Sequence, residues 1–115
     1  MEQNYDPNNL SVGHCVPCEG GTLPIDPVSA QVLIKNISNW VLSPDAKIIS
    51  KEFTFADFKT ALEFTNKIGA IAETEGHHPD IELGWGKVKI SLSTHAIDGL
   101  SGNDFILAAK IDEIN

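Results

Sequence analysis

The stretch TFADFKTALEFTNKIGAIAETEG, residues 54–76, decides the fold, because it predicts one long amphipathic helix between two strand-rich segments. Thr54 and Asp57 have the spacing of a capping box, with Asp in place of the usual Glu, so we expect the helix to begin here. Gly76 should end it, since glycine adopts the left-handed conformation at a helix end without strain. The expected apolar face comprises Phe58, Leu62, Thr65 and Ile68, flanked by Ala61, Phe64 and Ala72.

Strands are predicted on both sides of this helix. Before it, residues 40–42 and 48–53 are strand-like and flank a Ser-Pro-Asp-Ala turn, which indicates a hairpin. After it, residues 81–85 and 87–92 alternate apolar and polar side chains around a Gly-Trp-Gly turn. The sequence therefore predicts two antiparallel strand pairs separated by the long helix.

Two further helices complete the predicted order of elements. Asp26 and Pro27 form a helix-start signal, and this short helix should end at Asn39. Ser101 and Asp104 repeat the capping spacing at the start of a last apolar-faced helix. The order α-β-β-α-β-β-α predicts an α+β two-layer sandwich, in which a four-stranded antiparallel sheet carries helices on one face.

Length and charge limit the organisation and the partners. The 115 residues fit one domain, with residues 1–22 as an N-terminal arm, possibly extended, and residues 23–115 as the domain itself. The net charge is −8 and all eight basic residues are lysines, so we expect no direct binding to nucleic acid or to anionic membranes. No run of about 18 apolar residues and no signal-like start is present, so we expect a cytoplasmic protein.

The arm contains a Cys-x-x-Cys motif, Cys15 and Cys18, directly after His14. A structural zinc site normally needs four ligands, and a redox motif normally opens a helix beside a βαβ unit. Neither context is present, so we interpret the pair as ordinary thiols. A metal site that recruits His14 and a redox pair remain the alternatives.

Histidines gather where the long helix gives way to the next strand. Pro79 disfavours helical backbone at His78, so His77 and His78 should point in different directions. If the strand from Lys87 continues in register, His95 lies on its polar face. Such histidines suit proton transfer, although helix-end cations or solvated residues would give the same pattern. Adjacent histidines cannot easily chelate one ion, so we predict no metal site.

A family resemblance strengthens the catalytic interpretation. The run from Glu73 through His77, His78 and Pro79, followed by Trp85 and by KVKISLSTHAIDGLSGND at residues 87–104, resembles the signature of the pterin-4a-carbinolamine dehydratases. The resemblance extends over about residues 23–113. It implies the fold predicted above and the dehydration of 4a-hydroxytetrahydropterin to quinonoid dihydropterin in tetrahydrobiopterin recycling, with neither metal nor other cofactor.

The resemblance also implies roles for individual residues. A departing hydroxyl needs an acid and a ring nitrogen needs a base, so His77 and His95 are the acid/base candidates and His78 would orient the pterin. Asp104 has a second interpretation, because a capping box alone would explain it. Asn103 stands where some relatives carry arginine, which removes a cation near the site entrance. The expected catalytic residues are His77, His78 and His95, and the expected substrate-binding residues are Glu73, Pro79, Trp85 and Asp104.

Two other functions fit the same resemblance. Some similar proteins act as dimerisation cofactors that bind a transcription factor through protein contacts, and a dehydratase-like protein could also act in molybdopterin metabolism. Three acid/base groups favour the enzyme over the non-enzymatic binding protein. In every case we expect self-association, because a four-stranded open sheet leaves edge strands that another copy can pair with. The resemblance implies a homodimer or homotetramer, since the family forms both.

Overall fold

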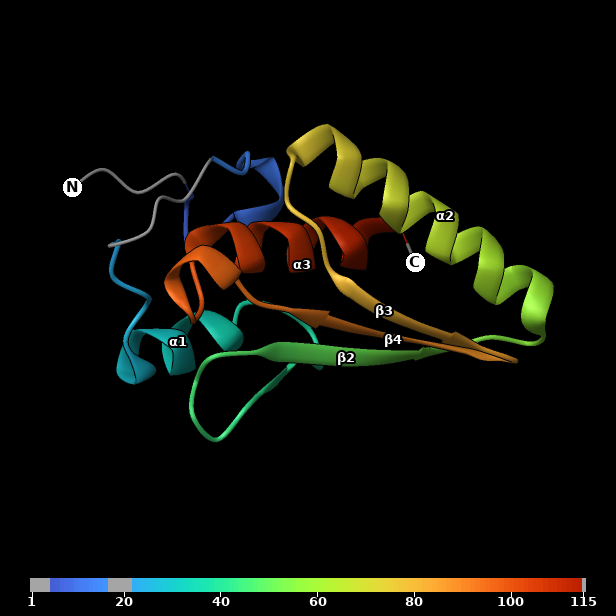
Figure 1. The fold of residues 1–115 in the computed structure, drawn as a ribbon, viewed down its shortest axis with the longest axis horizontal. Coiled ribbons are helices and arrows are strands. Elements are labelled where there is room, and N and C mark those ends of the chain that lie inside the picture. The colour runs from blue at the N-terminus through green and yellow to red at the C-terminus, as the bar shows by residue number, and fades with distance from the viewer. Residues whose placement is uncertain (1–4, 17–21, 115) are drawn as a thin grey trace.

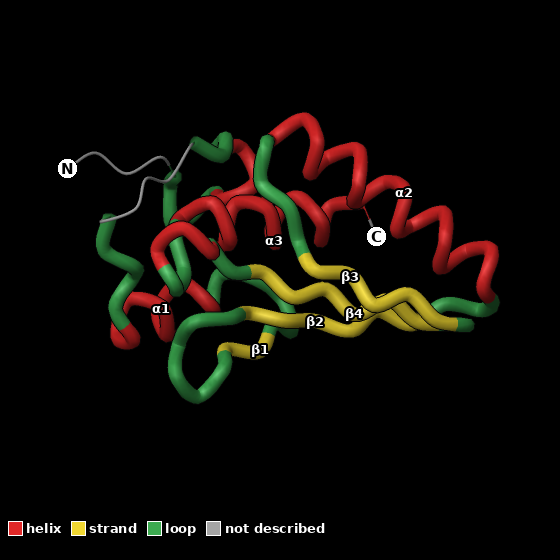
Figure 2. The backbone as a smooth tube through the Cα atoms, viewed as in Figure 1, coloured by secondary structure: helices red, strands yellow, loops and turns green. Residues whose placement is uncertain are grey.

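The computed structural model describes residues 5–16 and 22–114, and it confirms the predicted α+β sandwich. Helices α2 and α3 lie side by side over one face of the sheet (Figure 1), and α1 lies near β1 (Figure 2). The strands follow the order β1-β2-β4-β3, and every neighbouring pair is antiparallel (Figure 2). The described elements are η1 (Leu10–Val12), α1 (Pro27–Ile34), β1 (Val41–Leu42), β2 (Ile49–Thr54), α2 (Phe58–Glu75), β3 (Asp80–Gly84), β4 (Lys87–Leu92), η2 (His95–Ile97) and α3 (Gly102–Ile114).

Strand alternation places the core between the sheet and the helices. In β4, Val88, Ile90 and Leu92 are fully buried, and their register sets them beside Phe53 and Ile49 of β2. Helix α3 is buried along most of its length and contributes many of the fully buried side chains of the core. No helix in the described ranges is long and apolar enough to cross a membrane.

Helix α2 begins three residues later than the capping box predicts. Thr54 is the last residue of β2, and Asp57 is the N-cap, whose carboxylate accepts the Thr60 N–H at 2.9 Å. The buried face is rotated relative to the predicted one, because the predicted residues Phe58 and Leu62 are exposed, whereas Ile68 and the residues predicted to flank the face are buried. The sheet instead contacts a stripe whose small alanines allow close approach. The buried residues of α2 are Ala61, Phe64, Ile68 and Ala72.

Helix α1 is shorter than expected. Its Asp26 cap accepts the Ser29 N–H at 2.8 Å as predicted, but the α-helix ends at Ile34 and not at Asn39. The N–H of Asn36 bonds to the carbonyl three residues earlier, at 3.0 Å, so the backbone tightens before the left-handed Asn39 (φ 65°) turns it toward the sheet.

The N-terminal residues pack onto the domain. Leu10 of η1 is only 4% exposed and joins the core cluster, and η1 lies against α3 (Figure 1). The Lys110 ammonium of α3 donates to the Ser11 carbonyl at 2.8 Å. The described part of the arm therefore runs along α3 toward the C-terminal end of α2.

Candidate active site

A cavity of about 280 Å³ lies where the end of α2, the segment after β4 and the start of α3 meet. Its volume is close to the lower end of the range of about 300–1,000 Å³ that is typical of small-ligand sites. Three of the chain's four histidines contribute to its wall. The lining residues are Val16, Gly76, His77, His78, Ser93, Thr94, His95, Ala96 and Asn103.

The end of α2 sends the two adjacent histidines to different partners. Gly76 takes the predicted left-handed conformation (φ 67°), and its N–H and that of His77 both donate to the Ala72 carbonyl. The chain then turns so that the His77 side chain is only 12% exposed, whereas that of His78 is 60% exposed. His77 bonds inward to Asp104 of α3, and His78 bonds to Glu73 on the surface.

Asp104 is the fully buried centre of a hydrogen-bond network. Its Oδ1 is 2.6 Å from Nε2 of His77, and its Oδ2 accepts from the Thr94 hydroxyl at 2.8 Å and from the Ser101 N–H at 3.0 Å. The hydroxyls of Thr94 and Ser101 lie 2.7 Å apart. The bond to Ser101 is the reciprocal half of a capping box, so the capping and site interpretations of Asp104 both describe the same carboxylate.

This network determines the hydrogen-bonding state of His77. When Asp104 is ionised it can only accept hydrogen bonds, so Nε2 of His77 is then the protonated nitrogen and donates the hydrogen bond to Asp104. In the neutral ring, Nδ1 then holds the lone pair and can accept a proton. Asp104 thus orients His77 in the way that a buried acid orients the histidine of a catalytic triad.

His95 reaches the same cavity by a different route from the one expected. Strand β4 ends at Leu92, and His95 opens the 3₁₀ turn η2, so the predicted continuation of the strand is wrong. A bridge between Thr94 and Gly99 and the left-handed Asp98 (φ 50°) close this turn into a tight loop. His95 is exposed on the loop and lines the cavity beside the other two histidines.

The structure does not bring Pro79 and Trp85 to the cavity wall. Pro79 follows His78 and leads directly into β3. Trp85 is 73% exposed at the turn between β3 and β4, at the opposite end of β3. A strand rises by about 3.4 Å per residue, so the five residues of β3 separate its two ends by about 14 Å. Within one chain, Trp85 therefore does not shape this cavity.

Three residues at the site were not predicted as site residues, although one of them, Ser101, was predicted as a helix cap. Thr94 contacts Asp104, Ser101 completes the hydroxyl chain behind it, and Val16 of the arm lines the cavity. Thr94 could have been found from its position next to His95, and Ser101 from its capping spacing. No local pattern predicts that Val16 would meet a loop almost 80 residues away, because that contact depends on the path of the arm.

Cys15 packs near the site as a protonated thiol. Burial, with added effects from the carboxylates of Glu75 and Asp104, raises the pKa of Cys15 to about 12. Its Sγ lies 3.7 Å from the Asn103 carbonyl. Cys18, the other half of the motif, lies outside the described residues. Within the described ranges, no cluster of three or more His, Cys, Asp and Glu side chains could hold a metal ion.

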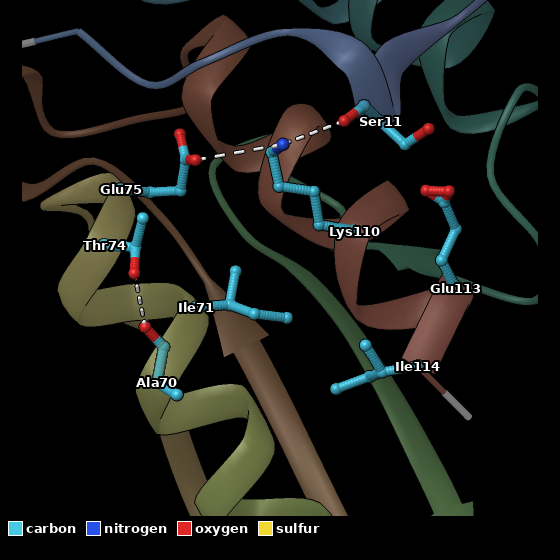
Figure 3. A pocket seen from close by; sticks show the side chains of 8 residues that line it. All are labelled: Ser11, Ala70, Ile71, Thr74, Glu75, Lys110, Glu113 and Ile114. Carbon is cyan, nitrogen blue, oxygen red and sulfur yellow. Dashed lines mark hydrogen bonds and ion pairs between the residues drawn. The ribbon is translucent and has the colours of Figure 1, made fainter.

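A second cavity, of about 380 Å³, lies between α2 and α3 beside η1 (Figure 3). Ile71 and Ile114 point into it, and at one end Lys110 lies between Glu75 and the Ser11 carbonyl. Its wall contains no histidine. We therefore take the histidine-lined cavity as the candidate active site, although it is the smaller of the two.

Comparisons with known proteins show similarity along most of the chain. The family described as Pterin 4 alpha carbinolamine dehydratase matches residues 24–114. A protein of Alkaliphilus metalliredigens is 49% identical over 107 residues, covering 92% of this chain and 96% of its own. One from Methylococcus capsulatus is 42% identical over 109 residues, covering 95% and 96%. Both names assign pterin-4-alpha-carbinolamine dehydratase activity provisionally.

One solved structure extends the similarity to the fold. The crystal structure of a Brucella melitensis protein named transcriptional coactivator/pterin dehydratase superimposes with a TM-score of 0.75 at 25% identity. The match covers 79% of this chain and 97% of that one. The similarity in fold therefore extends over nearly the whole of that protein.

Proposed function

Because this chain belongs to the pterin 4 alpha carbinolamine dehydratase family, we propose that it dehydrates a 4a-hydroxytetrahydropterin to the quinonoid dihydropterin, as in tetrahydrobiopterin recycling. In this reaction the bond between C4a and the hydroxyl oxygen breaks and the N5 lone pair forms a double bond to C4a. The hydroxyl leaves as water after protonation, and the N5 proton is lost. The reaction needs one acid and one base, and no oxidant or reductant.

The orientation of His77 by Asp104 is the observation that carries this proposal. Nδ1 of His77 can take the N5 proton while Asp104 stabilises the positive charge that develops on the ring. His95, exposed on the facing loop, is then suited to protonate the departing hydroxyl. We propose that His78, held by Glu73, orients the pterin at the rim of the cavity.

Single substitutions test these roles. Positioned acid and base groups each contribute roughly 10²–10⁴-fold to a rate, so His77→Ala and His95→Ala should each lower kcat by at least about 100-fold. Lys67→Ala, an exposed change on α2 outside the cavity, is the control and should retain full activity. Loss of activity in the control, or near-normal kcat in both histidine variants, would contradict the proposed roles.

A protein-binding role is the second candidate function. The Brucella melitensis neighbour is named as a coactivator as well as a dehydratase, and α2 of this chain exposes Phe58 (44%) and Leu62 (39%) on its outer side. Apolar side chains on an outer helix face are suited to contacts between proteins. Leu62→Glu should then abolish partner binding without changing kcat, whereas His77→Ala should do the reverse.

A further inference from the structure

The N-terminal arm contributes directly to the candidate active site. Val16 lines the same cavity as His77, His78 and His95, although the arm contains none of the expected site residues. It supplies the largest aliphatic side chain of this wall, and the rest of the lining is polar, aromatic or small. Val16 is 47% exposed, so part of its surface remains available to a bound molecule.

Asn103 fixes the backbone of Val16 from both sides. Its Oδ1 accepts the Val16 N–H at 3.0 Å, and its Nδ2 donates to the Val16 carbonyl at 2.6 Å. The carboxamide thus bonds to both the N–H and the carbonyl of one residue, as the backbone of a neighbouring β-strand does. Asn103 is only 3% exposed and precedes Asp104, so consecutive residues of α3 hold the arm and His77.

Glu75 holds the preceding residues of the arm. Its Oε1 accepts the Cys15 N–H at 2.8 Å, and its Oε2 lies 3.2 Å from Nδ1 of His14. The Glu75 side chain is only 6% exposed, and the Lys110 ammonium approaches it to 3.8 Å while bonding to the Ser11 carbonyl (Figure 3). A carboxylate buried with these partners stabilises one arrangement of the arm.

We propose, on the basis of the function proposed above, that Val16 forms a fixed part of the wall of the pterin cavity and packs against an uncharged part of the substrate. Asn103 positions Val16, and Glu75 holds the two residues that precede it. Asn103 therefore increases the affinity for the substrate by holding Val16 in place. It does not do so by binding a charged group of the substrate. Val16 contributes to substrate binding and takes no part in proton transfer. Removing its contact with the substrate therefore raises KM and leaves kcat nearly unchanged.

Two substitutions test the wall, and a third serves as a matched control. Val16→Ala and Asn103→Ala should each raise KM, on the order of 3- to 10-fold, with kcat within about twofold of wild type. The control is Asn36→Ala, which removes another asparagine side chain bonded to an arm carbonyl, that of Pro7 at 2.7 Å, outside the cavity. It should leave KM unchanged. Thermal melts of all variants establish that they are folded.

The double variant Val16→Ala/Asn103→Ala distinguishes positioning from a general loss of stability. If Asn103 acts through Val16, the effects on KM are not multiplicative, and the double variant resembles the stronger single one. Multiplicative effects, or a KM unchanged in Val16→Ala, would overturn the inference while leaving the dehydratase intact.

Binding of 7,8-dihydrobiopterin separates the inference from the proposed function. If wild type binds this probe without turning over the carbinolamine, weaker binding by Val16→Ala and Asn103→Ala supports the wall even though the proposed function fails. Equal binding by wild type and both variants overturns the wall alone. A wild-type protein that neither binds the probe nor turns over substrate overturns both.

Discussion

Asp104 accepts hydrogen bonds from His77, Thr94 and the Ser101 backbone, so one carboxylate both caps α3 and orients a candidate catalytic ring. The sequence predicted each part separately, because capping spacing and family resemblance both point to this position. It could not predict that the two roles coincide, since that depends on His77 and Thr94 arriving from other elements. The fold and the candidate chemistry are therefore coupled at this residue.

Asp104→Asn should lower kcat by at least about 100-fold, because an amide NH₂ that faces Nε2 of His77 favours the tautomer in which Nδ1 carries the proton and cannot act as a base. It should also lower the free energy of unfolding by about 1–3 kcal/mol, since the carboxamide has one acceptor oxygen for donors that now meet both ends. Steady-state assays and chemical denaturation measure the two effects. Thr94→Val is the comparison. This change also removes a hydrogen bond to Asp104 but leaves the bond between Asp104 and His77 in place, so kcat should fall much less.

Glu75 makes the docking of the arm dependent on pH. Burial acts to raise the pKa of Glu75, but the Cys15 N–H, His14 and Lys110 together hold that pKa below its ordinary value of 4.5. The ionised carboxylate therefore stabilises the folded state above about pH 4.5, and this contribution is lost as the pH falls through the lower, folded-state pKa.

The free energy of unfolding of wild type should accordingly exceed that of Glu75→Gln at pH 6, and the difference should shrink as the pH falls from 4.5 toward 3. Denaturant unfolding of both proteins across this range measures it. A difference that stays constant with pH would show that the charge of Glu75 does not hold the arm.

At the scale of the elements, the end of α2 positions two of the three histidines. Gly76 has φ 67°, and a Cβ added there would meet no atom within 4 Å, so only backbone strain opposes a side chain. Gly76→Ala should lower the free energy of unfolding by about 1–2 kcal/mol and also reduce kcat, because the strain displaces His77.

Gly69→Ala is the matched control for this prediction. Gly69 lies inside α2, and an added Cβ there also meets no atom within 4 Å. Because alanine is the better helix former, this change should raise stability by about 0.5–1 kcal/mol and leave kcat unchanged. Equal stability changes at the two glycines would contradict a specific role for the left-handed end of α2.

The limits of the sequence-based prediction also follow from the elements. Local signals predicted each α-helix and β-strand that the structure describes, because caps, turns and alternation act over a few residues. They included all four buried residues of α2 but centred the buried face on Phe58 and Leu62, which have a similar helical spacing and are exposed. Nor did they predict the loop at His95, which the bridge from Thr94 to Gly99 closes.

At the scale of the molecule, the open sheet predicts self-association. Strands β1 and β3 are its edges, and exposed apolar side chains lie near both, namely Val41 in β1 (63% exposed) and Trp85 after β3 (73%). Pairing of edges between copies would cover backbone groups and these side chains. Light scattering on the purified protein should give the mass of a dimer or a larger homo-oligomer, and a monomer at every concentration would contradict this.

The central claim is that three histidines in one cavity dehydrate a pterin carbinolamine, and a dehydration assay tests it most directly. Wild-type protein should accelerate the loss of water from 4a-hydroxytetrahydropterin well above the uncatalysed rate. The His77→Ala/His95→Ala double variant should have almost no activity while remaining folded. Wild-type activity no greater than that of this double variant would contradict the account.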